Sequence, residues 1–245
     1  MSSLFAELAH VETAMGELTL RRRREPQLQV DVFEVKLGDE YLMSSMFTVA
    51  EVELARLGLA RLGRAPLSVV VGGLGLGYTA QAVLEDARVG ELRVVEALEP
   101  VIDWHQAGLL PVSPTLLEDD RCHLVHGDFF AMARGAVGFD DREPGREVDA
   151  ILIDIDHSPV HTLDPSHADL YTIAGLRRLT RFLVPGGVFA LWSDDPPDED
   201  YLEVLRAVLV DVRAEVVEFP NHLTGGTSAN TVYLGVRADA AGDGR

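Results

Sequence analysis

Short apolar runs alternate with helical stretches along most of the chain after residue 66. The runs hold consecutive apolar residues instead of an alternation of apolar and polar ones, which is typical of strands buried on both faces. They are LSVVV (67–71), LRVVE (92–96), CHLVH (122–126), DAILID (149–154), VFALWS (188–193) and AEVVEF (214–219). Helices are predicted between them, near residues 78–86, 100–107, 129–135, 171–182 and 199–211. This alternation predicts a Rossmann-like, doubly wound α/β fold with a mostly parallel sheet.

The two ends of the chain add antiparallel elements. Residues 231–236 (TVYLGV) follow the preceding strand through a glycine-rich connection without a helix, so this seventh strand is expected to pair antiparallel. Near the N-terminus, a small β unit is predicted, with strands at 17–24, 30–37 and 41–44. TVAE (48–51) has the spacing of a capping box, beginning a helix that runs to about Leu62. We expect a β unit over 1–48, a Rossmann-like domain over 49–237 and a flexible tail over 238–245.

The composition is that of a globular protein with an excess of negative charge. Hydrophobic residues make up 47% and charged residues 25% of the 245 residues, which argues against disorder. There are 40 acidic residues against 21 lysines and arginines, a net charge of -19. Such a field repels phosphate backbones and anionic membranes, so nucleic acid is not an expected partner. It would attract cationic small molecules, although the same charge also serves plain solubility.

Three further observations concern disulfides, secretion and membranes. The single cysteine, Cys122, excludes a disulfide within the chain and a cysteine-based zinc site. The first residues lack a basic region followed by an apolar core, so we expect no signal peptide. We therefore expect a cytoplasmic location. Residues 65–84 are uncharged over about the length of a membrane span, but glycines interrupt them. A strand, a glycine turn and a helix explain this stretch, and no membrane segment is predicted.

The glycine turn, in VVVGGLGLGYTA (69–80), ends the first strand of the predicted sheet. Ligands of doubly wound sheets bind at the carboxyl ends of the strands, where Gly73, Gly75 and Gly77 would let the backbone approach one closely. The spacing is G-x-G-x-G, unlike the G-x-G-x-x-G that places a pyrophosphate on a helix N-terminus. No lysine or arginine lies nearby for a phosphate. The turn therefore favours an adenosine with a sulfonium group, and an NAD-dependent dehydrogenase is a more distant alternative.

The next two strand ends carry acids that fit an adenosine. Glu96 lies 19 residues after Gly77, close to the spacing of an acid that accepts the ribose hydroxyls. Asp128, in HGDFF, could accept from the exocyclic amine of adenine, and Phe129 would pack against the base. Each acid could instead cap a helix, and Asp128 stands directly before one. The agreement of three strand ends nonetheless predicts an adenosine site.

The fourth strand ends in ILIDIDHSP (151–159), an unusual exit for an apolar run. Asp154 is expected at the strand end facing the nucleotide, with Asp156 and His157 in a loop that covers it. Alternatively, both aspartates cap backbone N–H groups in a turn at Pro159. The ligand types of His157, His161 and Asp164 allow a metal site, but nothing in the spacing requires one and no metal is expected.

Two other polar stretches are open to more than one interpretation. His161 and His167, in HTLDPSHADLY, could belong to a lid over the site or to an ordinary solvated loop. SDDPPDEDY (193–201) could add acidic lining to a substrate cavity, but a helix cap by Asp198 is favoured.

Together these motifs resemble the class I S-adenosylmethionine-dependent transferases, and among them the spermidine synthase-like (polyamine aminopropyltransferase) branch. The resemblance covers about residues 15 to 237. It is carried by the N-terminal β unit, the closing β-hairpin and the segments VVVGGLGLGYTAQAVLE, VVEALEPVI, VHGDFF, DAILIDIDHSP and LYTIAGLRRLTRFLVPGGVFALWS.

The sequence departs from that family's pattern at four places. Leu76 stands where the family's GGGDGG loop has its aspartate, and Gln81-Ala82 replaces an Arg-Glu pair. The best match to a Tyr-His-Glu run before the nucleotide domain is Glu51-Val52-Glu53. His157 takes the place of the second aspartate in Asp-x-x-Asp-Pro, the family's base. These departures leave polyamine specificity open.

The resemblance implies transfer of an aminopropyl group from a sulfonium adenosine donor, S-adenosylmethionine or its decarboxylated form, to a small cationic amine. Asp154 would orient the amine, and His157 or Asp156 would take its proton. Alternatives are a small-molecule methyltransferase that uses S-adenosylmethionine, and a non-catalytic nucleotide-binding homologue or structural dimer partner. The resemblance also implies a possible homodimer through the N-terminal strands.

Overall fold

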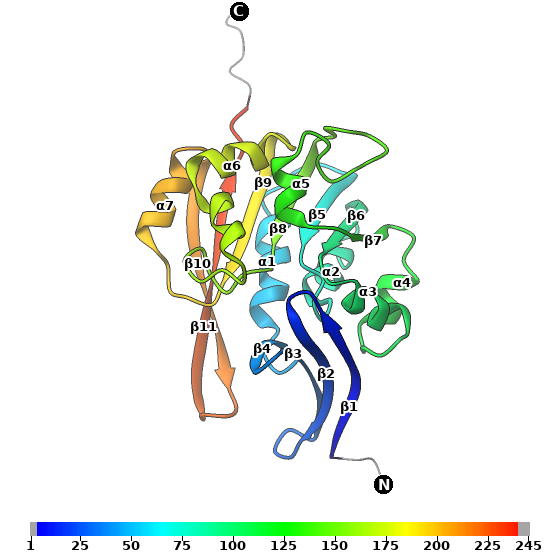
Figure 1. The fold of residues 1–245 in the computed structure, drawn as a ribbon. Coiled ribbons are helices and arrows are strands. Elements are labelled where there is room, and N and C mark those ends of the chain that lie inside the picture. The colour runs from blue at the N-terminus through cyan, green and yellow to red at the C-terminus, as the bar shows by residue number, and fades with distance from the viewer. Residues whose placement is uncertain (1–3, 240–245) are drawn as a thin grey trace, which may run out of the picture.

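The computed structural model describes residues 4–239 and contains two β-sheets (Figure 1). Of the tail expected over 238–245, residues 240–245 lie outside the described part of the chain. Within that part, no helix is both long enough and apolar enough to cross a membrane.

The N-terminal sheet is antiparallel with the order β1-β2-β3-β4. Its strands are β1 (Phe5–Thr13), β2 (Gly16–Glu25), β3 (Val30–Leu37) and β4 (Glu40–Ser44). The sequence interpretation missed β1. This edge strand buries none of its side chains and carries an irregularity between Glu7 and Ala9, so its apolar positions do not alternate cleanly.

The large sheet has seven strands in the order β10-β11-β9-β8-β5-β6-β7. They are β5 (Leu67–Gly72), β6 (Val89–Glu96), β7 (Cys122–His126), β8 (Val148–Ile153), β9 (Leu183–Ser193), β10 (Val210–Asn221) and β11 (Gly226–Val236). Neighbours from β7 to β9 run parallel, and β11 pairs antiparallel with both β9 and β10. The predicted fold is confirmed. The chain adds β6 and β7 on one side of β5 and then returns to add β8 and β9 on the other side. At such a reversal of strand order, a crevice opens at the carboxyl end of the central strand.

Helices cover both faces of the large sheet (Figure 1). On β5, Val69 and Val71 belong to one hydrophobic core and Val70 to the other, because successive side chains of a strand point to opposite faces. The helices are α1 (Val49–Leu59), α2 (Tyr78–Leu84), α3 (Glu99–Gln106), α4 (Ser113–Leu117), α5 (Phe129–Arg134), α6 (Ile173–Thr180) and α7 (Glu199–Arg206), with a 3₁₀ turn at η1 (Pro165–Tyr171). Double burial explains the continuously apolar strands.

The N-terminal sheet shares the first of these cores. Leu18 and Leu20 of β2 and Val35 of β3 are fully buried there with Leu54 of α1. The hairpin of β10 and β11 extends toward the same region (Figure 1), and the rings of Phe47 and Phe219 are 5.7 Å apart. The small sheet and this hairpin therefore flank the carboxyl ends of the parallel strands.

Candidate active site

Two adjoining cavities open at the carboxyl ends of the parallel strands. The first, which we call the strand-end cavity, has a volume of about 290 Å³ and lies over β5, β6 and β7. The second, the acidic cavity, has a volume of about 500 Å³ and lies between β4, α1, β9 and the β10–β11 hairpin. Both are lined by Leu42, Met43, Gly75, Asp154, Ile155 and His157. A ligand in one cavity can therefore meet a ligand in the other beside Asp154.

The glycine turn forms the floor of this junction. Gly73, Gly75 and Gly77 have φ values of 93°, 49° and 91°, a region that residues with a Cβ rarely adopt. Gly73 and Gly75 line the strand-end cavity, whereas Gly77 lines the acidic cavity and precedes α2. The turn therefore serves both cavities, and only part of it contacts the strand-end cavity.

Glu96, at the end of β6, lines the strand-end cavity but is already well hydrogen-bonded. Its Oε2 accepts from the N–H groups of Leu74 (3.0 Å) and Gly75 (3.4 Å), and its Oε1 accepts from that of Leu98 (2.8 Å). Burial raises the pKa of Glu96, and the backbone donors act in the opposite direction. Each carboxylate oxygen has two acceptor sites, and Oε2 already accepts from two donors. Oε1 is therefore the oxygen that can still accept from a ribose hydroxyl, while Oε2 holds the glycine turn in place.

Asp128 lines the same cavity and also caps a helix. Its Oδ1 accepts from the N–H of Ala131 at 3.0 Å, which is the N-cap arrangement of α5. The alternative considered from the sequence is thus present, and Oδ2 is the atom through which Asp128 would accept from a base.

The aromatic residues after Asp128 divide between core and cavity wall. Phe129 is only 2% exposed and stacks on Phe139 at a centroid distance of 4.9 Å, so the cavity receives little of its ring. Phe130 stacks on His167, with the two rings 3.7 Å apart and 11° from parallel. Both Phe130 and His167 line the strand-end cavity. The sequence interpretation gave the base-packing role to Phe129 alone.

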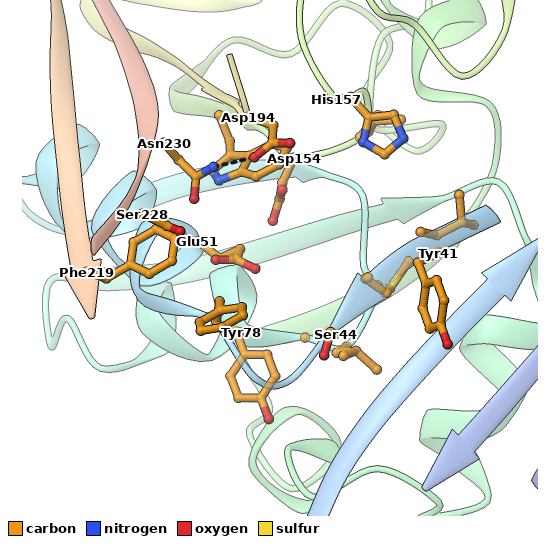
Figure 2. Close-up of a pocket in the computed structure, with 18 of the residues that line it drawn as sticks. Tyr41, Ser44, Glu51, Tyr78, Asp154, His157, Asp194, Phe219, Ser228 and Asn230 are labelled. Carbon is orange, nitrogen blue, oxygen red and sulfur yellow. Dashed lines mark hydrogen bonds between the residues drawn. The ribbon is translucent and has the colours of Figure 1, made fainter. Parts of the chain in front are cut away.

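Three carboxylates, Glu51, Asp154 and Asp194, line the acidic cavity (Figure 2). Its aromatic lining is Tyr41, Phe47, Tyr78, Trp192 and Phe219. All its lining residues belong to the described part of the chain, and none of them is a lysine or arginine. Aromatic faces and carboxylates both attract organic cations, so this cavity suits an ammonium group on an apolar chain.

Asp154 occupies the junction of the two cavities. Its Oδ2 accepts from the hydroxyl of Thr79 at 2.6 Å. Burial raises the pKa of Asp154 to about 6, although the Thr79 hydrogen bond lowers it. Burial, and then the carboxylates of Asp154 and Asp194, raise the pKa of Glu51 to about 8. Ionising both acids together is therefore costly until a cation binds between them.

Glu51 was not recognised from the sequence as a site residue. The TVAE pattern suggested that it caps its own helix, but Thr48 makes no side-chain cap hydrogen bond. The Glu51 side chain instead lines the acidic cavity. The signal that could have pointed to Glu51 is the match of Glu51-Val52-Glu53 to the position of the family's Tyr-His-Glu run.

The SDDPPDEDY stretch serves both of the purposes considered for it. Asp198 caps α7 by accepting from the N–H groups of Asp200 (2.9 Å) and Tyr201 (3.4 Å). Asp194 lines the acidic cavity, and its Oδ1 accepts from the side-chain amide of Asn230 at 2.7 Å. The backbone N–H of Asp194 also donates to the carbonyl of His157 at 2.7 Å.

Residues 155–171, which we call the cover segment, lie between β8 and α6, and Asp156 organises them from inside. Asp156 is 2% exposed and lines neither cavity. Its Oδ1 accepts from the N–H of Leu163 and from Nδ1–H of His167, both at 2.8 Å, and its Oδ2 accepts from the hydroxyl of Tyr171 at 2.6 Å. This placement differs from the expected one, in which Asp156 acts on the substrate, because the apolar strand exit buries it among donors.

Replacing Asp156 with alanine is expected to lower the free energy of opening of the cover segment by about 2–4 kcal/mol, since buried donors lose their acceptor. Amide hydrogen exchange at His161 and His167 would speed up accordingly. Tyr171→Phe, which removes one of the three hydrogen bonds, should have a smaller effect. Unchanged exchange together with a loss of kcat would instead mean that Asp156 acts on the reacting atoms.

The three residues considered for a metal site, His157, His161 and Asp164, each have another partner. Nε2 of His157 lies 3.2 Å from Oε1 of Glu40, and Nδ1 of His161 lies 2.8 Å from Oδ2 of Asp195. Asp164 caps the 3₁₀ turn through the N–H of Ser166. Over residues 4–239, the side chains with ligand atoms close enough to share a metal ion are His10, Glu12 and Glu17, which are exposed on the β1–β2 hairpin.

No family model matches the sequence. Among solved structures, the chain is similar to spermidine synthase from Thermotoga maritima, with 18% identity, a TM-score of 0.70, and coverage of 96% of this chain and 74% of that one. It is similar to a spermidine synthase in complex with the transition-state analogue AdoDATO, with 17% identity, a TM-score of 0.72 and the same coverage. The resemblance seen in the motifs is thus confirmed at the level of the fold.

Proposed function

We propose that this spermidine synthase-like fold carries an aminopropyltransferase-like activity. A sulfonium adenosine donor would occupy the strand-end cavity, and a cationic amine would occupy the acidic cavity. The observation that carries the proposal is the acidic cavity itself: Glu51, Asp154 and Asp194 line it, no lysine or arginine does, and it meets the strand-end cavity at Asp154.

The two cavities also favour one form of the donor. With the ribose at Glu96 and the base near Asp128, the sulfonium end of the nucleotide would lie toward Asp154. The tail beyond sulfur would then approach the acidic cavity. A methionine carboxylate would be repelled there by Glu51 and Asp194, whereas the amine of a decarboxylated tail would be attracted. Decarboxylated S-adenosylmethionine is therefore the proposed co-substrate.

The reaction is an in-line displacement at the carbon attached to sulfur. The amine nitrogen forms the new C–N bond, the C–S bond breaks, and its electron pair goes to sulfur, which leaves as the neutral thioether methylthioadenosine. The protein has to hold the reactants about 3 Å apart and keep water out. Asp154 would orient the amine, and His157, which lines both cavities, would cover the reacting atoms.

Methyl transfer is the second candidate, and one residue favours it. Leu76, at the family's aspartate position, is 6% exposed and adds an apolar wall to the acidic cavity. An apolar wall beside the donor's tail removes one of the charges that would hold an aminopropyl amine. The same arrangement without turnover would describe a non-catalytic nucleotide-binding protein.

Calorimetric titration with the two spent donors separates these functions. At pH 9, above the pKa of about 8 of Glu51, we expect methylthioadenosine to bind at least tenfold more tightly than S-adenosylhomocysteine, since a carboxylate beside two ionised acids costs about 1.4 kcal/mol or more. Glu96→Gln should weaken the binding of both ligands to the same extent. Glu51→Gln should reduce the difference between their two affinities. Tighter binding of S-adenosylhomocysteine would favour methyl transfer, and binding of neither would contradict the adenosine site.

A further inference from the structure

We propose that Glu51 is the proton acceptor of the transfer reaction and receives the proton that the acceptor ammonium must lose. This inference rests on the proposed function and adds to it a residue that the family motifs do not assign as the base. It concerns a carboxylate in the first turn of α1 that lines the acidic cavity together with Asp154 after β8.

The geometry places Glu51 and Asp154 around the same space. Both line the acidic cavity, and their carboxylates are directed to the same part of it (Figure 2). The hydroxyl of Thr79 connects the two residues, because it lies 2.6 Å from Oδ2 of Asp154 and 3.3 Å from the backbone carbonyl oxygen of Glu51. An ammonium held by Asp154 would therefore stand within reach of Glu51.

Burial and the acids that face Glu51 favour its protonated form, and the backbone N–H of Glu51 itself acts in the opposite direction. Asp154 at the end of β8 and Asp194 after β9 are acids, and each raises the pKa of Glu51. Tyr78 on α2 is half-buried, and burial raises its own pKa, so it stays neutral and adds no negative charge. His157 lines the cavity from the cover segment, with Glu40 beside its Nε2. Burial and the two neighbouring acids raise the pKa of Glu51, whereas the Thr79 hydroxyl favours the ionised form of Asp154.

The other candidate bases are less suited to this task. Asp156 is buried outside the cavities and accepts from three donors of its own segment. One oxygen of Asp154 already accepts from Thr79, a hydrogen bond that lowers its pKa. Nε2 of His157 lies 3.2 Å from Oε1 of Glu40 and is engaged there. A general base works best when its pKa lies near the operating pH. Glu51 meets that condition at the place where the amine would stand.

The sulfonium loses its positive charge during the transfer, and this loss raises the proton affinity of Glu51 as the proton arrives. Before transfer, three positive charges lie near Glu51: the attacking ammonium, the sulfonium and the ammonium of the donor's tail. Together they lower the pKa of Glu51 and keep it ionised. One N–H bond of the ammonium breaks, its proton passes to Glu51, and its electron pair forms the C–N bond. The pair of the C–S bond goes to sulfur. Two positive charges remain, on the new secondary amine and on the transferred aminopropyl group. Because this is one fewer than before transfer, the pKa of Glu51 rises again and the proton is retained.

Infrared difference spectroscopy of the free protein tests the first half of this inference. We expect a carboxyl that loses its protonated C=O band between pH 7 and 9, in line with the pKa of about 8. The band should be missing in Glu51→Gln and present in Glu53→Gln. Glu53 is the matched control, because it lies on the same helix but pairs with Arg56 at the surface. Titration of no carboxyl in this range would overturn the inference, whatever the protein's reaction.

Kinetics test the second half, with 1,4-diaminobutane and the decarboxylated donor as probes. We expect kcat/KM of the wild type to rise toward pH 8. Glu51→Gln should remove this rise and lower kcat by on the order of 10²–10⁴-fold. Glu51→Asp should restore part of the rate, and Glu53→Gln should match the wild type. A Glu51→Gln variant with kcat within twofold of the wild type would overturn the inference and leave the proposed function standing. If no variant turns over the probes, the proposed function fails for them and the infrared result alone decides on Glu51.

Discussion

Replacing Asp154 with asparagine is expected to lower turnover by on the order of 10³-fold and, at pH 8, to make the free protein more stable. Turnover falls because the neutral amide no longer holds a cationic amine at the junction of the two cavities. Stability rises because the ionised carboxylate is half-buried beside Glu51 and Asp194, and the amide oxygen can still accept from Thr79. We expect a gain of about 1–2 kcal/mol in the free energy of unfolding at pH 8.

The sign of the pH effect follows from the two raised pKa values. Between its unfolded pKa and about 6, Asp154 binds more protons in the folded protein than in the unfolded chain, so stability falls as pH rises through this window. Glu51 continues the decline up to about pH 8. The gain from Asp154→Asn should therefore be about half as large at pH 5 as at pH 8, as measured by urea denaturation at both.

Asp103→Asn, on the exposed side of α3, is the control for the loss of one negative charge and should change neither turnover nor stability appreciably. An Asp154→Asn variant that is less stable than the wild type at pH 8 would show that the carboxylate makes favourable contacts in the free protein. A variant that retains turnover would remove Asp154 from the proposed mechanism.

Replacing Gly73 with alanine should destabilise the protein by at least about 4 kcal/mol, or prevent it from folding. A Cβ at this position would lie 2.0 Å from the carbonyl oxygen of Asp154, and the backbone has a φ of 93°. The backbone cannot move aside easily. The N–H of Gly73 donates to Val95 of β6 at 2.9 Å, and the N–H of Asp154 donates to Gly72 at 2.8 Å, so three neighbouring strand ends are joined here.

The matched control is Gly63→Ala, in the loop after α1. A Cβ there meets no atom within 4 Å and the residue does not have a positive φ, so the change should be neutral or slightly stabilising. The two variants are compared by thermal unfolding and by methylthioadenosine binding to any folded fraction. Gly73→Ala with normal stability and normal binding would mean that the ends of β5, β6 and β8 can separate without loss of the site.

The parts of the fold that the sequence predicted are those with strong local patterns. The parallel strands are buried on both faces, so their apolar runs stand out, and the glycine turn marks where β5 ends. β1 was missed because it is an edge strand whose side chains are all at least partly exposed. Its place is decided by pairing with β2, and an unburied strand leaves little trace in its own sequence.

The sequence predicted those site residues that directly follow the end of a strand. Glu96, Asp128 and Asp154 all line the strand-end cavity, as their positions after β6, β7 and β8 suggested. Their roles toward a ligand remain proposals. Glu51 and Asp194 could not be placed in this way, because their meeting depends on how α1 packs against the end of β9. Asp156 shows the opposite case, since its position beside Asp154 said nothing about the three donors that surround it.

The middle position of β11, between β9 and β10, bears on the order in which the two cavities form during synthesis. β10 reaches the sheet only through β11, so the last third of the sheet has to wait until residues 226–236 have been made. The residues that line the strand-end cavity all precede residue 168. The acidic cavity, in contrast, is completed by Phe219, Ser228 and Asn230. A growing chain would therefore acquire the wall for a nucleoside well before it acquires the wall for an amine. The second wall depends on the contacts with the largest separation along the chain, which are the slowest to form.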